Sequence, residues 1–244
     1  MKDKRAVILC GGKGTRLKPY TVVLPKPLMP IGEYPIIEVI IRQLKSYGFK
    51  RITLAVNHQA EIFKAFFGNG DKWDIKIDYV LEQKPLGTMG PLTLIDDLDD
   101  SFLVMNGDVL SDLDFDNFYT QHQNSKSIFS ISSFKRKQLI DFGVLDRSSE
   151  NYLSGFREKP EFDFEVSTGI YMIDKETVKY IPKNSFFGFD TLMLKLIDLD
   201  EKVNLIEHKG LWLDIGRPDD YMMATEIYNE NKHNKELYNN LFNN

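Results

Sequence analysis

The chain has 244 residues, of which 42% are hydrophobic and 27% charged, and its formal net charge is −5 with a pI near 5.5. This composition is that of an ordinary globular protein, and the acidic balance argues against a broad binding surface for nucleic acid or for an anionic membrane. A single cysteine excludes an internal disulfide, and no apolar stretch approaches the ~20 residues of a membrane-spanning helix.

Strand-like apolar runs alternate with helical patterns through the first half of the chain. Strands are predicted at residues 6–10, 52–56, 75–81 and 102–105, and helices at residues 35–47, 59–67 and 89–97. This alternation predicts an α/β fold with a mostly parallel central sheet and helices on both faces. Ligands bind such sheets at the carboxyl ends of the strands, so the segments that follow the strands are the first place to look for a site.

The second half of the chain has strand patterns with fewer helices between them. Strands are predicted at residues 127–134, 142–146, 152–156, 166–173 and 203–208, followed by a helix at 218–228. We interpret this half as a mixed insertion on the first sheet. No internal repeat or linker is evident, so residues 1–230 are expected to form one domain, with halves at about 1–112 and 113–230. Residues 231–244 form an Asn-rich tail, for which we expect a short helix with a frayed end.

A glycine-rich segment follows the first predicted strand. Residues 9–17 read LCGGKGTRL, and residues 24–28 read LPKPL. Glycines allow backbone N–H groups to approach phosphate oxygens closely. A Walker loop would place Lys and then Ser or Thr after its last glycine, and a dinucleotide fingerprint would need glycine in place of Leu17. The segment is therefore a third type of phosphate loop, with Arg16 and Lys26 as its cationic partners.

The pattern G-G-x-G-T-R-L followed by P-K-P-L resembles the signature of the sugar-1-phosphate nucleotidyltransferases, also called nucleotide-sugar pyrophosphorylases. Four further segments match this family in order, namely 85–88 (PLGT), 106–108 (NGD), 157–160 (REKP) and 212–216 (WLDIG). The resemblance extends from Lys4 to about Tyr228. It implies a Rossmann-like nucleotidyltransferase fold with a mixed sugar-binding insertion. It also implies a reaction in which a sugar 1-phosphate attacks the α-phosphate of a nucleoside triphosphate and expels pyrophosphate, with Mg²⁺ as the cofactor.

The resemblance also assigns roles to individual residues. Arg16 would face the departing β- and γ-phosphates, and Lys26 would contact the α-phosphate. Asp108 is matched as a catalytic residue, and Asp108 and Asp214 are matched as magnesium ligands. The nucleotide-binding positions would be Leu9, Gly11, Gly12, Gly14, Thr15, Gln83, Pro85, Gly87 and Thr88. The sugar-phosphate positions would be Gly143, Glu158, Lys159, Ser167, Thr168 and Gly169, with Lys159 as the phosphate clamp. Many relatives have Asn where this chain has Ser167, and this difference bears on the identity of the sugar.

Residues 82–92 and 210–216 look most like the GDP-mannose pyrophosphorylases, which favours GTP with a mannose-like, hexosamine or heptose 1-phosphate. Thymidylyl, uridylyl or cytidylyl transfer stays open within the same family. Outside it, the alternatives are a catalytically silent regulatory subunit that binds nucleotide sugars and a glycosyltransferase that consumes them. A glycosyltransferase would be expected to have paired aspartates around its metal, whereas residues 106–108 supply one.

Several other residues receive simpler interpretations. Cys10 is expected to be a small buried hydrophobe, Asp112 and Asp114 to be turn or helix caps, and residues 96–100 to form a solvated acidic loop. The four histidines show no metal-ligand spacing, so zinc is not expected. Residues 1–5 lead directly into a strand rather than into a signal-peptide pattern, which makes the cytoplasm the expected compartment. The expected partners are a nucleoside triphosphate and a sugar 1-phosphate, without nucleic acid or membrane, and a homodimer is favoured over a tetramer.

Overall fold

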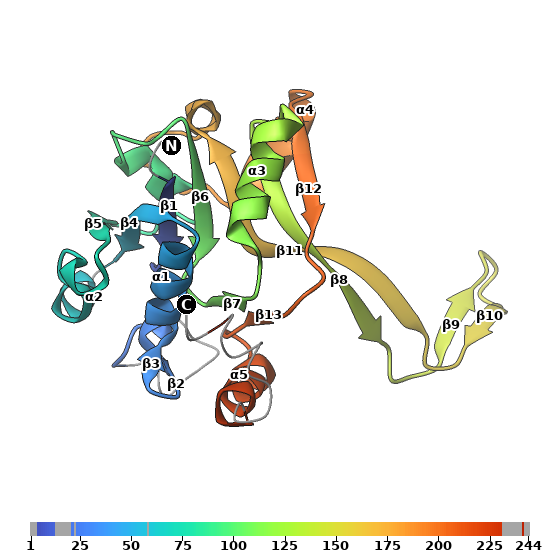
Figure 1. Cartoon of the computed structure of the whole chain (residues 1–244). Helices are drawn as coiled ribbons and strands as arrows, with labels where there is room; N and C mark the ends of the chain where they lie inside the picture. The colour runs from blue at the N-terminus through green and yellow to red at the C-terminus, as the bar shows by residue number, and fades with distance from the viewer. Residues whose placement is uncertain (1–3, 13–20, 22, 58, 231–240, 242–244) are drawn as a thin grey trace.

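The computed structural model describes residues 4–12, 21, 23–57, 59–230 and 241, and its centre is a seven-stranded sheet with the order β12-β8-β11-β6-β1-β4-β5 (Figure 1). Its strands are β1 (Lys4–Leu9), β4 (Phe49–Val56), β5 (Lys76–Leu81), β6 (Ser101–Asn106), β8 (Phe129–Leu139), β11 (Glu161–Asp174) and β12 (Val203–Glu207). The pairs β1–β4, β1–β6, β4–β5 and β8–β12 are parallel, whereas β11 is antiparallel to β6 and β8. The predicted mostly parallel sheet is therefore confirmed.

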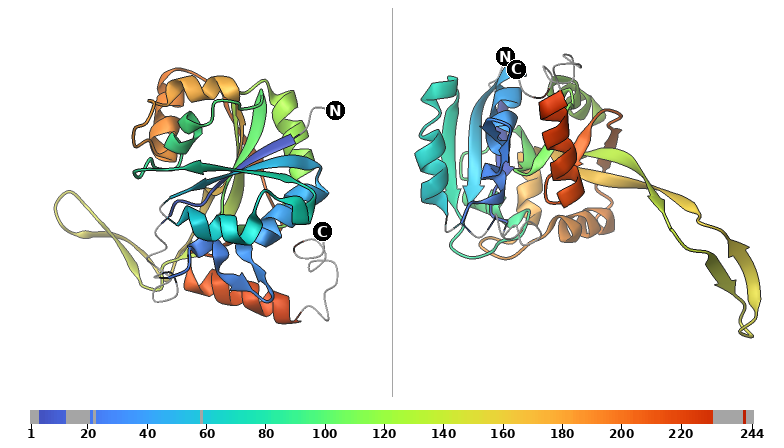
Figure 2. Two further views of the ribbon diagram at one scale, coloured as in Figure 1. Left: turned by 90° about the vertical axis from the view of Figure 1, so that its left-hand side faces the viewer. Right: turned by 90° about the horizontal axis from the view of Figure 1, so that it is seen from below.

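Both faces of this sheet are covered, as the alternation of side chains along β1 shows. Ala6 and Ile8 pack into one hydrophobic layer, and Val7 packs into the other. The first layer contains side chains from α1 (Ile36–Ser46), α2 (Ala60–Phe67), α3 (Phe115–Ser125) and α5 (Pro218–Glu230). The second contains α4 (Phe189–Asp198) and the short 3₁₀ helix η5 (Gly90–Leu94) (Figure 2). A strand that is buried on both faces reads as a continuous apolar run, which is why β1 was predictable.

The smaller elements complete the chain. They are η3 (Lys26–Leu28), β2 (Pro30–Ile31), β3 (Tyr34–Pro35), η4 (Asp71–Trp73), β7 (Val109–Ser111), β9 (Val144–Arg147), β10 (Leu153–Arg157), η6 (Lys175–Tyr180) and β13 (Trp212–Asp214). β9 and β10 form a hairpin of their own, and β7 pairs with β13 outside the main sheet. None of the helices in the described ranges combines the length and apolar character needed to cross a bilayer. Within the tail predicted at 231–244, only Leu241 is described, and it is buried in the core.

The helix predictions were partly wrong. In place of the helix expected at residues 89–97, the structure has only the short 3₁₀ helix η5. It ends at Ile95, where the backbone becomes extended, and Arg5 then binds Asp97. The helices α3 and α4 were not predicted. On α3 the described buried side chains are Phe115, Phe118 and His122, so little of its surface is apolar. Asp114 caps α3 as expected, and its carboxylate accepts a hydrogen bond from the Asn117 N–H (2.9 Å).

One part of the structure projects from the rest. Beyond the pairing of Ser133 with Ser167, β8 and β11 continue as a two-stranded ribbon that pairs with no other strand and ends in the β9–β10 hairpin. Figures 1 and 2 show this segment extending away from the sheet in every view. We refer to residues 134–166 as the arm.

Arg5, on strand β1, is a buried charged residue with a relative exposure of 1%. Its Nε and Nη2 donate to the Thr53 hydroxyl (3.2 and 2.8 Å), and its Nη1 donates to the backbone and side-chain oxygens of Asp97 (2.6 and 3.1 Å). Arg51 also pairs with Asp97 (2.6 Å), and this guanidinium with Arg5 lowers the pKa of Asp97 to about 2. The acidic loop at 96–100 is thus anchored to two arginines at Asp97 and is not simply solvated.

Replacing Thr53 with Val should destabilise the fold. Valine has the shape of threonine but no acceptor, so two N–H groups of the buried Arg5 lose their partner, at a cost of about 2 kcal/mol in the free energy of unfolding. Chemical denaturation of the wild type and T53V measures this difference. Thr120→Val, on the exposed side of α3, is the control and should change stability by no more than about 0.5 kcal/mol. Equal stability of T53V and wild type would contradict the assigned role.

Candidate active site

Two predicted motifs meet where the parallel strands β1 and β6 end. Leu9 is paired with Asn106, and the Gly107 N–H donates to the Leu9 carbonyl (2.9 Å). A Cβ atom on Gly107 would lie 3.0 Å from the Cys10 sulfur and 3.1 Å from the Leu9 carbonyl oxygen, so the close approach of the two strand ends favours glycine here. The sequence expectation that the glycine loop and residues 106–108 share one edge of the sheet is confirmed.

Lys26 forms the electrostatic centre of this edge. It starts the short helix η3 between two prolines, and its side chain is only 8% exposed. Its ammonium forms ion pairs with the carboxylates of Asp108 and Asp214, the latter at 3.6 Å. A side chain at Gly216 would collide with this ammonium, so the glycine leaves the space that Lys26 occupies. The structure therefore brings together three of the predicted catalytic and metal-binding residues.

Asp214 reaches this point through the small β7–β13 sheet. Asp214 is paired with Val109, directly after Asp108, and the Ile215 N–H donates to the Asp108 carbonyl (2.9 Å). The Asp214 backbone N–H donates to the Asp220 carboxylate (3.0 Å), and the Asp214 carboxylate accepts from the Gly216 N–H (2.8 Å). Backbone pairing thus fixes the distance between two carboxylates that are far apart in the sequence.

The two aspartates fit a divalent cation. Their carboxylates converge on one ammonium, and hard oxygen donors of this kind suit Mg²⁺, which retains several waters and takes further ligands from phosphate. Within the described part of the chain, no group of three His, Cys, Asp or Glu side chains is arranged to hold an ion by itself. Asp108 and Asp214 could therefore hold a metal together with water and a phosphate ligand.

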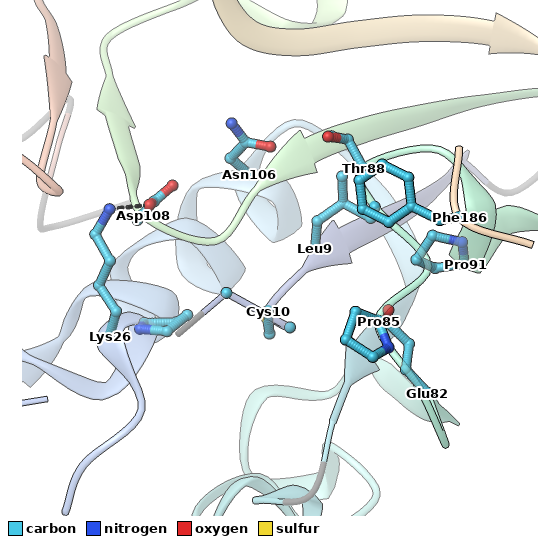
Figure 3. Close-up of a pocket in the computed structure, with 14 residues that line it drawn as sticks. Leu9, Cys10, Lys26, Glu82, Pro85, Thr88, Pro91, Asn106, Asp108 and Phe186 are labelled. Carbon is cyan, nitrogen blue, oxygen red and sulfur yellow. Dashed lines mark hydrogen bonds and ion pairs between the residues drawn. The ribbon is translucent and has the colours of Figure 1, made fainter. Parts of the chain in front are cut away.

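A cavity of about 330 Å³ opens on one side of Asp108 (Figure 3). It is lined by the predicted residues Leu9, Gly11, Gly12, Lys26, Pro85, Gly87, Thr88 and Asp108. Its other lining residues, which the sequence did not single out as site residues, are Cys10, Pro27, Glu82, Pro91, Asn106 and Phe186. Cys10 is buried as expected, and this burial raises the pKa of its thiol, so it remains an uncharged wall residue. Gly14, Thr15 and Arg16 lie outside the described residues.

Glu82, rather than Gln83, points to this cavity. The Gln83 side chain is exposed and is not among the cavity-lining residues. The Glu82 carboxylate accepts a hydrogen bond from the Leu86 N–H (3.2 Å), and burial raises its pKa. A side chain at Gly11 would collide with this carboxylate, so Gly11 and Glu82 are in direct proximity. The signal for Glu82 was present in the sequence, because a residue directly after a parallel strand lies at the ligand-binding edge.

A second cavity of about 310 Å³ lies on the other side of Asp108 and shares Asn106 and Asp108 with the first. The predicted residues Ser167, Thr168, Gly169 and Asp214 line it, together with Val109, Tyr171, Phe189 and Trp212. The Trp212 indole N–H donates to the Thr168 carbonyl (2.9 Å), so the small sheet and the bulged part of β11 are connected across this cavity. Two cavities therefore meet at the Lys26–Asp108–Asp214 cluster.

Three predicted sugar-phosphate residues do not reach either cavity in this structure. Gly143, Glu158 and Lys159 all lie on the arm, which projects from the sheet (Figures 1 and 2). Gly143 and Glu158 are neighbours there, because a Cβ on Gly143 would lie 3.3 Å from a Glu158 carboxylate oxygen. Lys159 forms an exposed ion pair with Asp141 (2.7 Å).

His208 and Asp112 form an ion pair beside the small β7–β13 sheet. The His208 Nε2 lies 3.1 Å from the Asp112 carboxylate, 2.9 Å from the Leu211 carbonyl and 3.1 Å from the Ser111 hydroxyl. Burial disfavours the imidazolium, but the bonds to Asp112 and Leu211 outweigh burial and raise the pKa of His208. Burial opposes ionisation of Asp112 as well, yet the bonds from His208 and the Leu211 N–H lower its pKa. Asp112 is thus a connector between β7 and β13 and not the cap that the sequence suggested.

This ion pair should give the stability a defined pH dependence. The raised pKa of His208 means that its contribution is complete below about pH 6.5 and is lost as the pH rises through the folded-state value. The lowered pKa of Asp112 means that its contribution is complete above about pH 4 and is lost as the pH falls. His208→Gln keeps a donor but does not titrate, so it should cost about 1–2 kcal/mol at pH 6 and less at pH 9. Denaturation of wild type, H208Q and Asp112→Asn at both pH values measures this, and a difference that is independent of pH would contradict it.

Comparison with known proteins agrees with this geometry. A protein-family model described as Nucleotidyl transferase matches residues 5–231. A UTP–glucose-1-phosphate uridylyltransferase of Synechocystis sp. is 31% identical over 240 residues, covering 90% of this chain and 62% of that protein. A mannose-1-phosphate guanyltransferase of Candida albicans is 31% identical over 233 residues, covering 92% and 64%. The chain thus spans somewhat less than two thirds of the length of these curated relatives.

Solved structures show the same fold. The crystal structure of HddC from Yersinia pseudotuberculosis is 27% identical, has a TM-score of 0.72, and the match covers 92% of this chain and 99% of that one. A second structure of HddC, complexed with GMP-PN, is 26% identical with a TM-score of 0.69 and the same coverage. The family match across nearly the whole chain confirms the resemblance that the glycine loop and the four later motifs indicated. The chain therefore belongs to the nucleotidyl transferase family.

Proposed function

We propose that the protein is a sugar-1-phosphate nucleotidyltransferase, which joins a nucleoside triphosphate to a sugar 1-phosphate and releases pyrophosphate. The observation that carries this proposal is the pair of cavities that meet at Lys26, Asp108 and Asp214. One cavity would hold the nucleotide and the other the sugar phosphate. The reacting phosphorus would then lie at the junction, beside the one described cationic side chain that lines the cavities.

The reaction requires positioning and charge neutralisation more than covalent chemistry. A phosphate oxygen of the sugar 1-phosphate forms a bond to the α-phosphorus of the triphosphate, while the bond from that phosphorus to the bridging oxygen breaks and pyrophosphate leaves with the electron pair. The protein must hold two anions in line and offset their repulsion. Lys26 is suited to this task because its ammonium is buried and is held in place by two carboxylates.

Asp108 and Asp214 would hold Mg²⁺ in this proposal. A bound Mg²⁺ neutralises phosphate charge and keeps the reacting groups oriented. In the structure, the Lys26 ammonium lies between the two carboxylates and balances one of their two charges. A triphosphate would draw Lys26 toward its oxygens, so that the aspartates become available to a metal ion.

Replacing Lys26 or Asp108 should remove turnover and preserve the fold. We expect Lys26→Met and Asp108→Asn to lower kcat by about 10²–10³ or more, since each loses a charge at the reacting phosphate. Pyrophosphate release with Mg²⁺ gives the rates, and thermal unfolding monitors the fold. Lys202→Met is the control and should retain full activity, because Lys202 is exposed and lines neither cavity. Wild-type turnover by either site variant would refute the assigned roles.

The base is proposed to be guanine, because the Glu82 carboxylate lines the cavity proposed for the nucleotide. Guanine presents two adjacent donors, N1–H and the exocyclic amino group, which a single carboxylate can accept together. Uracil and thymine present one donor between two acceptors, and a carboxylate would be repelled by those acceptors. Two relatives support the choice, because one is named a mannose-1-phosphate guanyltransferase and HddC was solved with GMP-PN. The uridylyltransferase among the relatives keeps uridylyl transfer as the alternative, beside thymidylyl and cytidylyl transfer.

Glu82→Gln should lower discrimination for GTP. The amide replaces one acceptor by a donor, so kcat/KM for GTP should fall by about 10- to 100-fold, in line with 1–3 kcal/mol for a paired base contact. Activity with UTP and dTTP should be unchanged or higher. Gln83→Ala is the matched variant, because Gln83 is the neighbouring residue that the family resemblance assigned to the base. A loss with Q83A and none with E82Q would return base recognition to Gln83.

The sugar is proposed to be a mannose-like, hexosamine or heptose unit. Ser167, with its small side chain, and Gly169, which has none, line the second cavity, and Trp212 supplies an apolar wall. The proposed roles of Gly143, Glu158 and Lys159 on the sugar phosphate require the arm to reach a cavity. Pyrophosphate release across five triphosphates and a panel of sugar 1-phosphates would name the product. Nucleotide binding without release on any of them would favour the regulatory alternative.

A further inference from the structure

The arm exposes an unusual amount of apolar surface. Between Ser133 and Ser167, β8 and β11 pair only with each other, and large apolar side chains point into solvent. These are Leu139, Phe142, Leu145, Tyr152, Leu153, Phe156 and Phe164, each between 53% and 77% exposed. A two-stranded ribbon is at best marginally stable in water, and clustered exposed apolar side chains mark a contact surface. The arm therefore needs a surface to lie on.

The arm's own chain does not supply that surface. The β8–β11 ladder is regular from Glu161 to Ser167, and its irregularity lies where the arm joins the sheet, between Ser167 and Tyr171. A swing toward the chain's own cavities would have to occur at this bulge. There Thr168 is 1% exposed, its hydroxyl donates to the Ser132 carbonyl (2.9 Å), and its carbonyl accepts from Trp212. The root of the arm is fixed by the same contacts that form the second cavity.

The described residues that line the cavities carry little positive charge. Among these residues Lys26 is the one cation, whereas three carboxylates, those of Glu82, Asp108 and Asp214, line the two cavities. Two bound polyanions would increase this imbalance. An apolar contact point is present at the cavity edge as well, because the Phe186 side chain is 71% exposed beside the nucleotide cavity.

The end of the arm carries two cationic side chains. Arg157 and Lys159 are exposed, and within the described part of the chain they form ion pairs with other arm residues, Asp146 at 3.0 Å and Asp141 at 2.7 Å. Lys159 also has a left-handed backbone (φ +40°) directly before a proline, where an extended conformation is the usual one. Such strain at a non-glycine residue is typical of functional positions.

We propose that two copies of this chain exchange arms, so that the arm of one copy lies across the second copy and brings its Lys159 to the sugar phosphate in the partner's second cavity. This inference rests on the proposed function. The occupant of the arm's apolar surface is thus a second copy of this chain, related by a two-fold axis, and each active site contains residues of both copies. In this arrangement the β8–β11 ladder keeps the direction it has in the structure, and no hinge at Thr168 is needed.

Complementation between two inactive variants tests the exchange. Lys26→Ala impairs the cavity of its own copy and leaves a normal arm, whereas Lys159→Ala impairs the arm and leaves a normal cavity. Differently tagged K26A and K159A chains, produced together and mixed in equal amounts, should recover about a quarter of wild-type activity, because half of the dimers are mixed and each contains one complete site. Mixing K26A with Asp108→Asn is the control and should recover nothing, since both defects lie in the cavity.

Each failure has a separate meaning. Full activity of K159A alone, or no recovery from two variants that are each inactive, would overturn arm exchange and leave the nucleotidyltransferase proposal intact. Recovery only at the level of the control would indicate that each arm serves its own copy. Full activity of K26A would instead contradict the proposed function itself.

The oligomeric state provides a test that needs no activity. Analytical ultracentrifugation should show a dimer for the wild type and a monomer for Phe142→Ser/Leu145→Ser/Phe156→Ser, with unchanged unfolding of the body. Leu194→Ser/Ile197→Ser removes exposed apolar side chains from α4 instead and should remain dimeric. A monomeric wild type, or a dimer that survives the triple substitution at the arm, would overturn the proposal.

Discussion

A buried ammonium needs partners, and at this sheet edge the partners come from distant parts of the chain. Lys26 is on a proline-flanked turn after the glycine loop, Asp108 follows the central strand β6, and Asp214 ends the short strand β13. Removing such a charge from water is costly unless carboxylates compensate it. Because the three side chains pair at this point, the interaction holds the first and last thirds of the chain against the end of β6, where the two cavities meet.

The same arrangement limits how well the site can bind anions, because the cluster contains more carboxylates than ammonium groups. Two carboxylates around one ammonium leave a negative balance, and Glu82 is the one further charged side chain among the described residues that line the cavities. Under the proposed function, a site with this balance would bind a triphosphate together with cations, a condition that Mg²⁺ would fulfil. A metal ion, a nucleotide and a further cationic side chain would then each improve the binding of the others, because each offsets charge that the others face.

The sequence was most informative where one local rule decides the structure. Continuous apolar runs marked β1 and β6 because both faces of these strands are buried, and the glycine and NGD motifs therefore had to share an edge. It was less informative where a single-residue offset decides, as at Glu82 and Gln83, since neighbours at a strand end point in opposite directions. The position of Gly143, Glu158 and Lys159 was not predictable either, because the path of the arm depends on the bulge at Thr168 and not on local propensity.

Strand β11 connects two parts of the molecule with different sources of stability. Residues 170–174 are held between β6 and β8 in the core, whereas residues 161–166 pair only with β8 and are largely exposed. The buried half is stabilised by burial on both faces, and the exposed half has no core of its own. A segment of this kind would be stabilised by a surface that covers it, and under the proposed arm exchange this stabilisation would depend on association by mass action. Because β11 is continuous, the position of a bound arm would be transmitted directly to Ser167, Thr168 and Gly169 at the cavity wall.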